Sequence, residues 1–221
     1  MNNNICLPKA SVPEHTENGY KYIQELNYFN AIACLLVIFI HVVAIGISGL
    51  TVGSWQENIL YLPWRLAAFV VPAFLFSGAV KMAQQIKFAK DKDFSYFQYM
   101  AERCKTILLP YIAFCFIYFF TLGMMGYIPF DFNTLIRGMM TGDLSGQFYY
   151  IIIVIQFYIL FPIWKHLVKN TPIWAGLPLS LIISMLSLKI PVYFEMFGIN
   201  TAYIDRFCIL YAFFWSMGLY V

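Results

Sequence analysis

Charged residues are scarce in this chain of 221 residues. They make up 11% of it, whereas a soluble domain carries about 25%. Hydrophobic residues make up 61%, and the mean hydropathy is +0.70. This deficit of charge predicts a polytopic membrane protein. The formal net charge is only +3, and no run of Lys and Arg is typical of nucleic-acid binding, so we expect no nucleic-acid partner.

The sequence also lacks paired cysteines and a cleavable signal peptide. None of the five cysteines falls in a CxxC pair, so the sequence predicts neither disulfides nor a metal site. The segment 1–27 is polar and has no apolar core. We expect it to be a poorly ordered cytoplasmic tail, and the first apolar run must then act as the targeting signal.

What the sequence does contain is a series of apolar runs, each about as long as a membrane-spanning helix. They predict an all-α, polytopic transmembrane bundle in residues 28–221, with about six spans at 28–48, 59–82, 106–125, 147–164, 173–188 and 207–221. Pro72 predicts a kink in the second span. Asp93 or Ser95 is predicted to cap a short amphipathic helix before the third. The last run stays apolar to Val221, which predicts a chain cut inside or just after a span.

The distribution of Lys and Arg predicts the orientation. With the N-terminal tail inside, the inner segments hold all of the 14 Lys and Arg residues except Arg65, Arg137, Lys189 and Arg206. Cytoplasmic loops carry an excess of positive charge. The N-terminus is therefore predicted to be cytoplasmic, and the expected location is a multi-pass position in the cell membrane, surrounded by the lipid bilayer.

His41 is the candidate catalytic residue, because it lies well inside the first apolar run. An ionisable side chain is costly in hydrocarbon and is usually functional there. Asn30 precedes it by eleven residues, which returns to within about 20° of the same helix face and places the two roughly 16 Å apart. Neutral imidazole is a plausible base near pH 7. The alternative is a packing histidine that hydrogen-bonds another helix.

Four segments together resemble the membrane-bound acyltransferase 3 family. ELNYFNAIACLLVIFIHV in this chain resembles the first span of that family, whose pattern has an acidic residue, a leucine, an arginine and then a histidine eleven residues further on. VVPAFLFSGAV, YMAERCKTILLPYIAF and GQFYYIIIVIQFYILFPI resemble its second span, its entry to the third and its fourth. Within the family, the last two look most like O-acyltransferases of surface polysaccharides, such as the intercellular adhesin poly-N-acetylglucosamine system.

Two departures from the family pattern concern the site. The usual acidic residue is Asn27 here, and the arginine is Asn30. If the arginine binds the donor or acceptor, another cation must replace it, and Arg65 and Arg103 are the candidates. The family also has about ten spans. Six are predicted here, so the resemblance implies that about four further spans of the family are missing from this chain.

The resemblance implies an integral membrane acyltransferase. It would move an acetyl or succinyl type of acyl group from cytoplasmic acyl-coenzyme A, a donor substrate rather than a bound cofactor, to a hydroxyl of a cell-envelope or extracellular polysaccharide. His41 would act as general base or carry the acyl group. Asn30, Arg65, Arg103 and Lys105 are the candidate donor- or substrate-binding residues. The basic segment 87–105 suits the phosphates of the coenzyme, although positive-inside topology alone also explains it.

Two other functions remain open. One is a transporter or flippase for a polysaccharide or a lipid-linked sugar, and the other is an inactive truncated remnant. Ser77 and Gly78 are interpreted as a site of close helix packing. Gln147 and Gln156 are about 180° apart on a helix, so at most one of them can face a common cavity.

Overall fold

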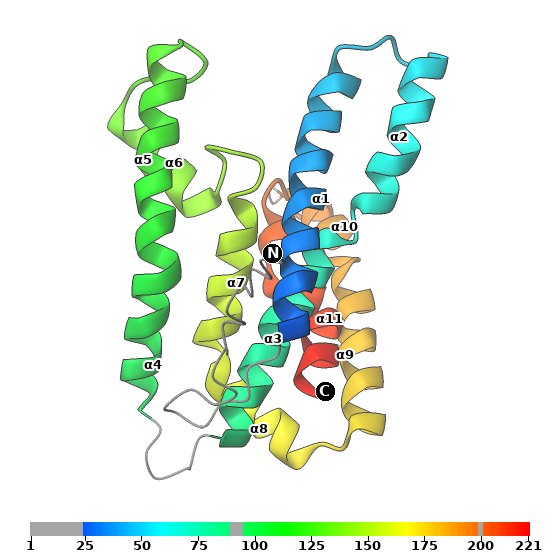
Figure 1. Ribbon diagram of the computed structural model, residues 1–221, viewed down its shortest axis with the longest axis vertical. Helices are drawn as coiled ribbons and strands as arrows, with labels where there is room; N and C mark the ends of the chain where they lie inside the picture. Colours follow the sequence, from blue (N-terminus) through cyan, green and yellow to red (C-terminus); the bar gives the residue numbers. More distant parts are fainter. Residues whose placement is uncertain (1–23, 89–94, 199–200) are drawn as a thin grey trace, which may run out of the picture.

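The computed structural model describes residues 24–88, 95–198 and 201–221, and within these ranges every regular element is a helix (Figure 1). The predictions for residues 1–23 and for Asp93 lie outside the described residues. The elements are α1 Gln24–Ser48, α2 Trp55–Ala67, α3 Val70–Phe88, α4 Tyr96–Arg103, the π-helical η1 Cys104–Leu108, α5 Leu109–Met124, α6 Phe132–Thr141, α7 Tyr149–Ile159, α8 Phe161–Asn170, α9 Ile173–Ser187, α10 Ile190–Met196, the 3₁₀ turns η2 Ile204–Arg206 and η3 Cys208–Tyr211, and α11 Ala212–Leu219.

The helices confirm the all-α membrane class, but they do not confirm six spans. Among the described residues, four helices are long and apolar enough to cross a membrane, or five if a bent pair counts as one span. The predicted sixth span corresponds to the shorter apolar helix Cys208–Leu219, and a straight crossing needs about 20 residues. The first span begins at Gln24, ahead of the predicted boundary at Tyr28.

The second span is broken where Pro72 requires it. Pro72 has no N–H to donate to the carbonyl four residues earlier, and its ring would clash with that carbonyl. That carbonyl belongs to Ala68, which ends α2, and the regular hydrogen bonds resume with Ala73 N–H donating to the Phe69 carbonyl at 3.0 Å. The predicted kink is therefore confirmed, as a break between α2 and α3.

The third span starts earlier than the predicted boundary at residue 106, because the predicted short helix is continuous with it in one apolar span, Tyr96–Met124. This span also contains an unpredicted π turn. Ser95 caps α4, with its hydroxyl accepting from Gln98 N–H. The π turn η1 follows, and Leu109 N–H donates to the Cys104 carbonyl. Pro110 comes directly after it, in the first turn of α5. The wider turn accommodates the missing N–H of Pro110, and such turns are frequent at functional sites.

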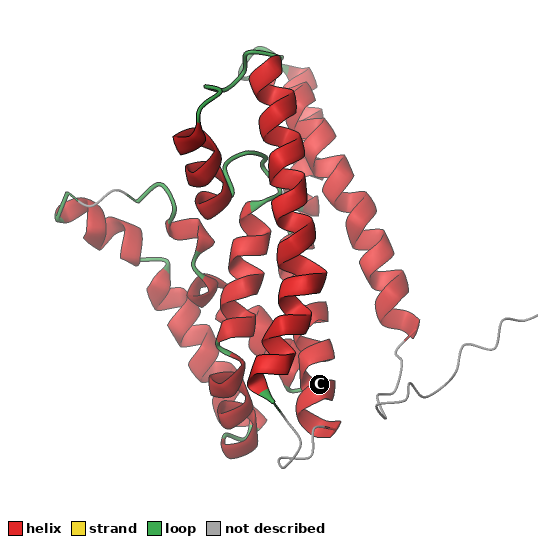
Figure 2. Ribbon diagram, turned by 90° about the vertical axis from the view of Figure 1, so that its left-hand side faces the viewer, coloured by secondary structure: helices red, strands yellow, loops and turns green. Residues whose placement is uncertain are grey.

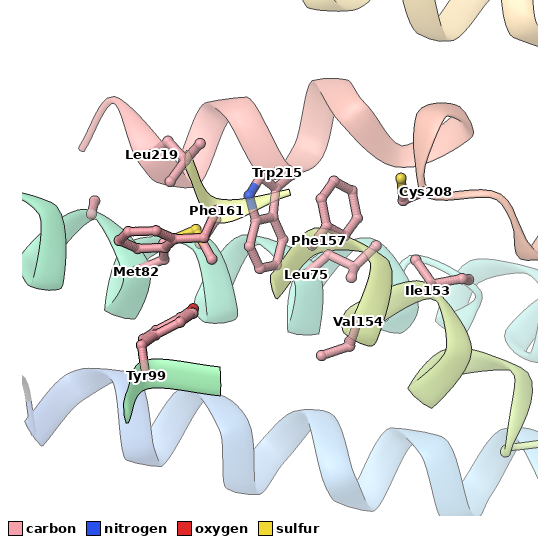
Figure 3. Close-up of a cluster of buried hydrophobic side chains, with 12 residues drawn as sticks. Leu75, Met82, Tyr99, Ile153, Val154, Phe157, Phe161, Cys208, Trp215 and Leu219 are labelled. Atoms are coloured by element: carbon pink, nitrogen blue, oxygen red, sulfur yellow. The ribbon is translucent and has the colours of Figure 1, made fainter. Parts of the chain in front are cut away.

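The fourth span bends by 59° between α7 and α8. Beside this bend lies the main hydrophobic core, in which Trp215 of α11 stacks on Phe157 of α7 with ring centroids 4.2 Å apart (Figure 3). Gly78 of α3 lies against the Trp215 ring, and Ser77 is 2% exposed. This is the close packing that the sequence predicted for Ser77 and Gly78.

The helices alternate in direction along the long axis of the bundle. α1, the α4–α5 column and α9 run from the lower to the upper end in Figure 1, whereas α3, α7 and α11 run downward. The start of α1, the end of α3, the start of α4, α8 and the C-terminus therefore lie toward one end. The side view shows the same arrangement of long, roughly parallel helices joined by loops (Figure 2).

Candidate functional site

His41 lines a cavity of about 680 Å³ between α1, α3, the η1–α5 column and the start of α7. The residues around it are almost all apolar, and they are Cys34, Val37, Ile38, Ile40 and His41 from α1, Val70, Val71 and Phe74 from α3, Thr106, Ile107, Pro110, Tyr111 and Phe114 from η1 and α5, and Gln147–Ile151 at the start of α7. The His41 side chain is half-buried, and among the described residues no hydrogen bond to its ring is formed. The alternative of a packing histidine bonded to another helix is therefore not what the structure shows.

The helix directions place His41 at the upper end of the cavity. Along α1 the lining runs from Cys34 up to His41, and along α7 it runs from Gln147 down to Ile151 (Figure 1). Thr106 lies at the beginning of the upward η1–α5 column, so it belongs to the lower end. The seven residues from Cys34 to His41 cover roughly 10 Å of helix axis. This apolar cavity, called the channel below, thus has an imidazole at one end.

The α6–α7 loop closes the upper end against His41. A methyl group added at Gly146 would lie 3.4 Å from His41 Cε1 and 3.7 Å from Nδ1, so the imidazole ring packs directly over this glycine. α6 ends at Gly142, whose positive φ of 72° favours glycine and turns the chain sharply toward α7. The loop geometry therefore sets the position of His41.

Gln147, two residues before α7, is a polar residue that lines the cavity with His41. Its amide orientation is fixed from both sides, because Ser145 Oγ donates to Oε1 at 2.6 Å and Nε2 donates to the Tyr118 hydroxyl at 3.1 Å. Gln156 faces away, with Nε2 donating to the Arg206 carbonyl and Oε1 accepting from Cys208 N–H. The sequence allowed one of these two glutamines in a common cavity, and the structure places Gln147 there.

Asn30 lies one turn below Cys34 on α1, so it sits just beyond the lower end of the cavity. It does not line the cavity itself. Its Oδ1 atom is buried and has no hydrogen-bond partner among the described residues. A buried carbonyl oxygen without a partner costs free energy.

Arg103 and Lys105 also lie near the lower end, where η1 leads into the cavity. The Arg103 guanidinium is half-buried between two aromatic rings, 5.1 Å from the Tyr99 centroid and 5.2 Å from that of Tyr158. Lys105 is exposed and directly precedes the lining residue Thr106. These two cations are therefore placed at one end of the channel, and His41 at the other.

Arg65 is not part of this arrangement. It is an exposed residue in the last turn of α2, which lies at the upper right of Figure 1, while α4 lies at the lower left. Arg65 and Arg103 thus lie on helices at opposite sides of the bundle in this view. The sequence analysis missed Thr106 and Tyr111, because nothing in a single sequence distinguishes their positions from other lipid-facing or packed positions.

A polar cluster on the far side of the α6–α7 loop ties this loop to the segment before α11. Arg206 donates to Asp143 Oδ1 at 2.6 Å and to the Thr141 carbonyl, and its guanidinium lies 4.6 Å from the Tyr203 ring. Partial burial raises the pKa of Asp143, but hydrogen bonds from Arg206, Tyr203 and Thr141 outweigh it and lower the pKa overall. The carboxylate therefore stays ionised and holds the loop.

The fold and the site define a class: a helical membrane protein with an apolar channel that has a histidine at one end. Residues 23–221 match the family described as an acyltransferase domain. This match covers most of the chain, so the protein belongs to the acyltransferase 3 family, and membership implies acyltransferase activity. No curated protein sequence and no solved structure shows significant similarity to the chain.

Proposed function

We propose that this acyltransferase moves an acyl group from acyl-coenzyme A to a hydroxyl of a cell-envelope or extracellular polysaccharide. The observation that carries the proposal is the apolar channel with His41 at one end and Arg103 and Lys105 near the other. A thin, weakly polar acyl-pantetheine arm suits such a channel, and cations beyond its lower end suit the phosphates of the donor. We place the protein in the cell membrane, with this lower end facing the cytoplasm.

The chemical step assigned to His41 is general base catalysis. The imidazole takes the proton of the acceptor hydroxyl while the hydroxyl oxygen forms an ester bond to the acyl carbon. The thioester C–S bond breaks, and the departing thiolate receives the proton from the imidazolium. In the alternative, His41 itself carries the acyl group between donor and acceptor. In both, Gln147 lines the channel beside the reacting groups, and Asn30, just beyond the lower end of the channel, is assigned to binding of the donor.

The variant His41→Ala tests this function. We expect it to insert and fold normally and to lose at least about 10²-fold in acyl transfer, as expected for removal of a general base. The matched control is Ile45→Ala, one turn further along α1, where the side chain is 74% exposed and does not line the cavity. The assay measures loss of acetyl- or succinyl-coenzyme A together with acylation of a purified glycan acceptor.

The outcomes separate the open alternatives. Normal acylation by the His41→Ala variant would contradict the assigned role. An acyl adduct on His41, trapped without acceptor and found by mass spectrometry, would favour the carrier mechanism over the base. A protein that moves glycan across vesicles without consuming the donor would support the transporter alternative. A wild-type protein without either activity would support the inactive remnant.

A further inference from the structure

The part of the α6–α7 loop that lies beside the imidazole, residues 145–147, is held between two buried side chains. Leu144 on one side is 5% exposed, and Phe148 on the other is 7% exposed. Both belong to a small hydrophobic core that this loop shares with α5 and α6. Gly146, in the middle of the segment, lies against the His41 ring. Because the segment is anchored at both ends, it keeps a defined position relative to the imidazole.

The side chain of Gln147 is fixed as well, although it lines the channel. Ser145 Oγ donates to its Oε1 atom at 2.6 Å, and its Nε2 atom donates to the Tyr118 hydroxyl of α5 at 3.1 Å. The Tyr118 ring packs edge-on against that of Phe148, with centroids 5.1 Å apart. A primary amide carries two N–H groups, and within the described part of the chain Nε2 makes one hydrogen bond. One N–H of an oriented donor therefore remains for a bound molecule.

The proposed reaction creates negative charge in this part of the channel. When the acceptor hydroxyl attacks the acyl carbon, an electron pair of the acyl C=O bond moves to its oxygen, which becomes an oxyanion. The hydroxyl gives its proton to His41 in the same step, so the oxyanion forms close to the imidazole and to the loop that packs on it. Side-chain amides that are already oriented toward such a charge contribute strongly to acyl transfer.

We propose that Gln147 is a catalytic residue that donates its remaining N–H to the oxyanion, and that Tyr118 and Ser145 are positioning residues that orient the amide. This inference rests on the proposed function. It applies to both mechanisms for His41, because attack by a hydroxyl and attack by the imidazole each produce an oxyanion on the acyl group. When the tetrahedral intermediate collapses, the electron pair returns to the carbonyl and the thiolate leaves, so Gln147 neither gains nor loses a proton.

The variant Gln147→Glu separates this role from a structural one. A carboxylate of nearly the same shape can accept from Ser145 Oγ and from the Tyr118 hydroxyl, so both links to the loop and to α5 are kept, but it has no N–H to donate. We expect kcat for acyl transfer to fall by about 10²–10³-fold, with KM for acyl-coenzyme A and for the glycan near the wild-type values. Gln147→Met lacks the N–H without adding charge, and it should show the same division between kcat and KM.

Gln156→Met is the matched control, because Gln156 faces away from the channel and donates to the Arg206 carbonyl. We expect this variant to have a lower thermal midpoint, since backbone groups lose their partner, and an unchanged kcat per folded protein. Tyr118→Phe removes the hydroxyl that accepts from Gln147 Nε2. It should lower kcat by less than Gln147→Met does, again without a change in KM.

Each other outcome overturns a definite statement. If the wild type transfers the acyl group and both Gln147 variants do so equally well, the oxyanion role is wrong and the proposed function stands. A higher KM at unchanged kcat would mean that Gln147 binds a substrate in its ground state and does not act on the transition state. A loss of kcat that only follows a loss of folded protein would make its role structural. If the wild type consumes no acyl-coenzyme A, the proposed function is wrong, and the role of Gln147 is wrong with it.

Discussion

The two halves of the bundle are packed very differently. Around Trp215, helices α3, α7 and α11 approach closely: Trp215 is fully buried, and a methyl group added at Gly218 of α11 would lie 2.4 Å from the Phe76 carbonyl oxygen of α3. On the other side, Ala33 is the buried residue of α1, and α1 and α5 face each other across the cavity (Figure 1). One half is the main packed core, and the other combines a smaller core around Tyr111, Cys115 and Phe148 with the open cavity.

This difference explains how a small bundle holds a cavity. A channel between helices leaves side chains without neighbours and loses their dispersion contacts. The dense α3–α7–α11 core offsets this loss and fixes α3 and α7, which each contribute one wall of the channel. His41 therefore lies in the half that contains the cavity, next to helices α3 and α7, which the main core holds in place.

The largest expected effect on stability comes from replacing an aromatic side chain by alanine, and it should differ between the two halves. Trp215→Ala removes a fully buried ring that stacks on Phe157, and we expect it to lower the free energy of unfolding by about 3–5 kcal/mol. Phe114→Ala, in the channel wall at 53% exposed, should cost less than about 1 kcal/mol. Thermal or denaturant unfolding in detergent measures both. Equal losses would mean that the two halves are packed alike.

Much of the fold could be predicted from the sequence, because hydropathy and proline act locally. The apolar runs, the break before Pro72 and the Ser95 cap all follow from side chains within one or two turns. The sixth span is not confirmed. The run 207–221 is apolar throughout, but 3₁₀ turns occupy Ile204–Arg206 and Cys208–Tyr211, and the regular helix Ala212–Leu219 is short. Hydropathy does not report where a helix starts within an apolar run.

The candidate site was only partly predictable. His41 can be picked out from the sequence because an imidazole in hydrocarbon is costly. The spacing of Gln147 and Gln156, about 180° apart on a helix, correctly allowed only one of them in the cavity. Arg65 and Arg103 were equal candidates in the sequence, and only the tertiary arrangement separates them, with Arg103 toward the channel and Arg65 on α2. The contact of His41 with Gly146 joins residues far apart in the chain, and no local pattern could indicate it.

The second prediction uses Gly146 to separate the channel from the core. Gly146→Ala should be tolerated, because the added methyl group would lie 3.4 Å from His41 Cε1. Gly146→Val adds methyl groups that must displace the imidazole, and we expect acyl transfer to fall by about 10–100-fold, since small misplacements of a catalytic group cost this much. The thermal midpoint should change little in either variant. A valine variant with full activity would show that the ring position does not matter.

The smallest expected effect concerns the link between the halves, where Asp143 of the α6–α7 loop pairs with Arg206 before α11. Because the pKa of Asp143 is lowered below 3.8 in the folded protein, its ionised form stabilises the fold. This contribution is complete above the unfolded pKa of about 3.9 and disappears as the pH falls through the lower folded value. The carboxylate is partly exposed, so we expect Asp143→Asn to lower the free energy of unfolding by less than about 1 kcal/mol at pH 7.

The pH dependence distinguishes this ion pair from a general effect of the substitution. Unfolding midpoints of the wild type and Asp143→Asn should differ at pH 7 and at pH 5, and they should converge as the medium is acidified below the folded pKa. Asp205→Asn is the matched control, because Asp205 is 60% exposed and lies 3.7 Å from Arg206 Nε, and it should have the smaller effect. A difference between wild type and Asp143→Asn that persists in acid would assign the stabilisation to packing of the loop. Convergence would show that a single charge pair couples the loop next to His41 to the packed core.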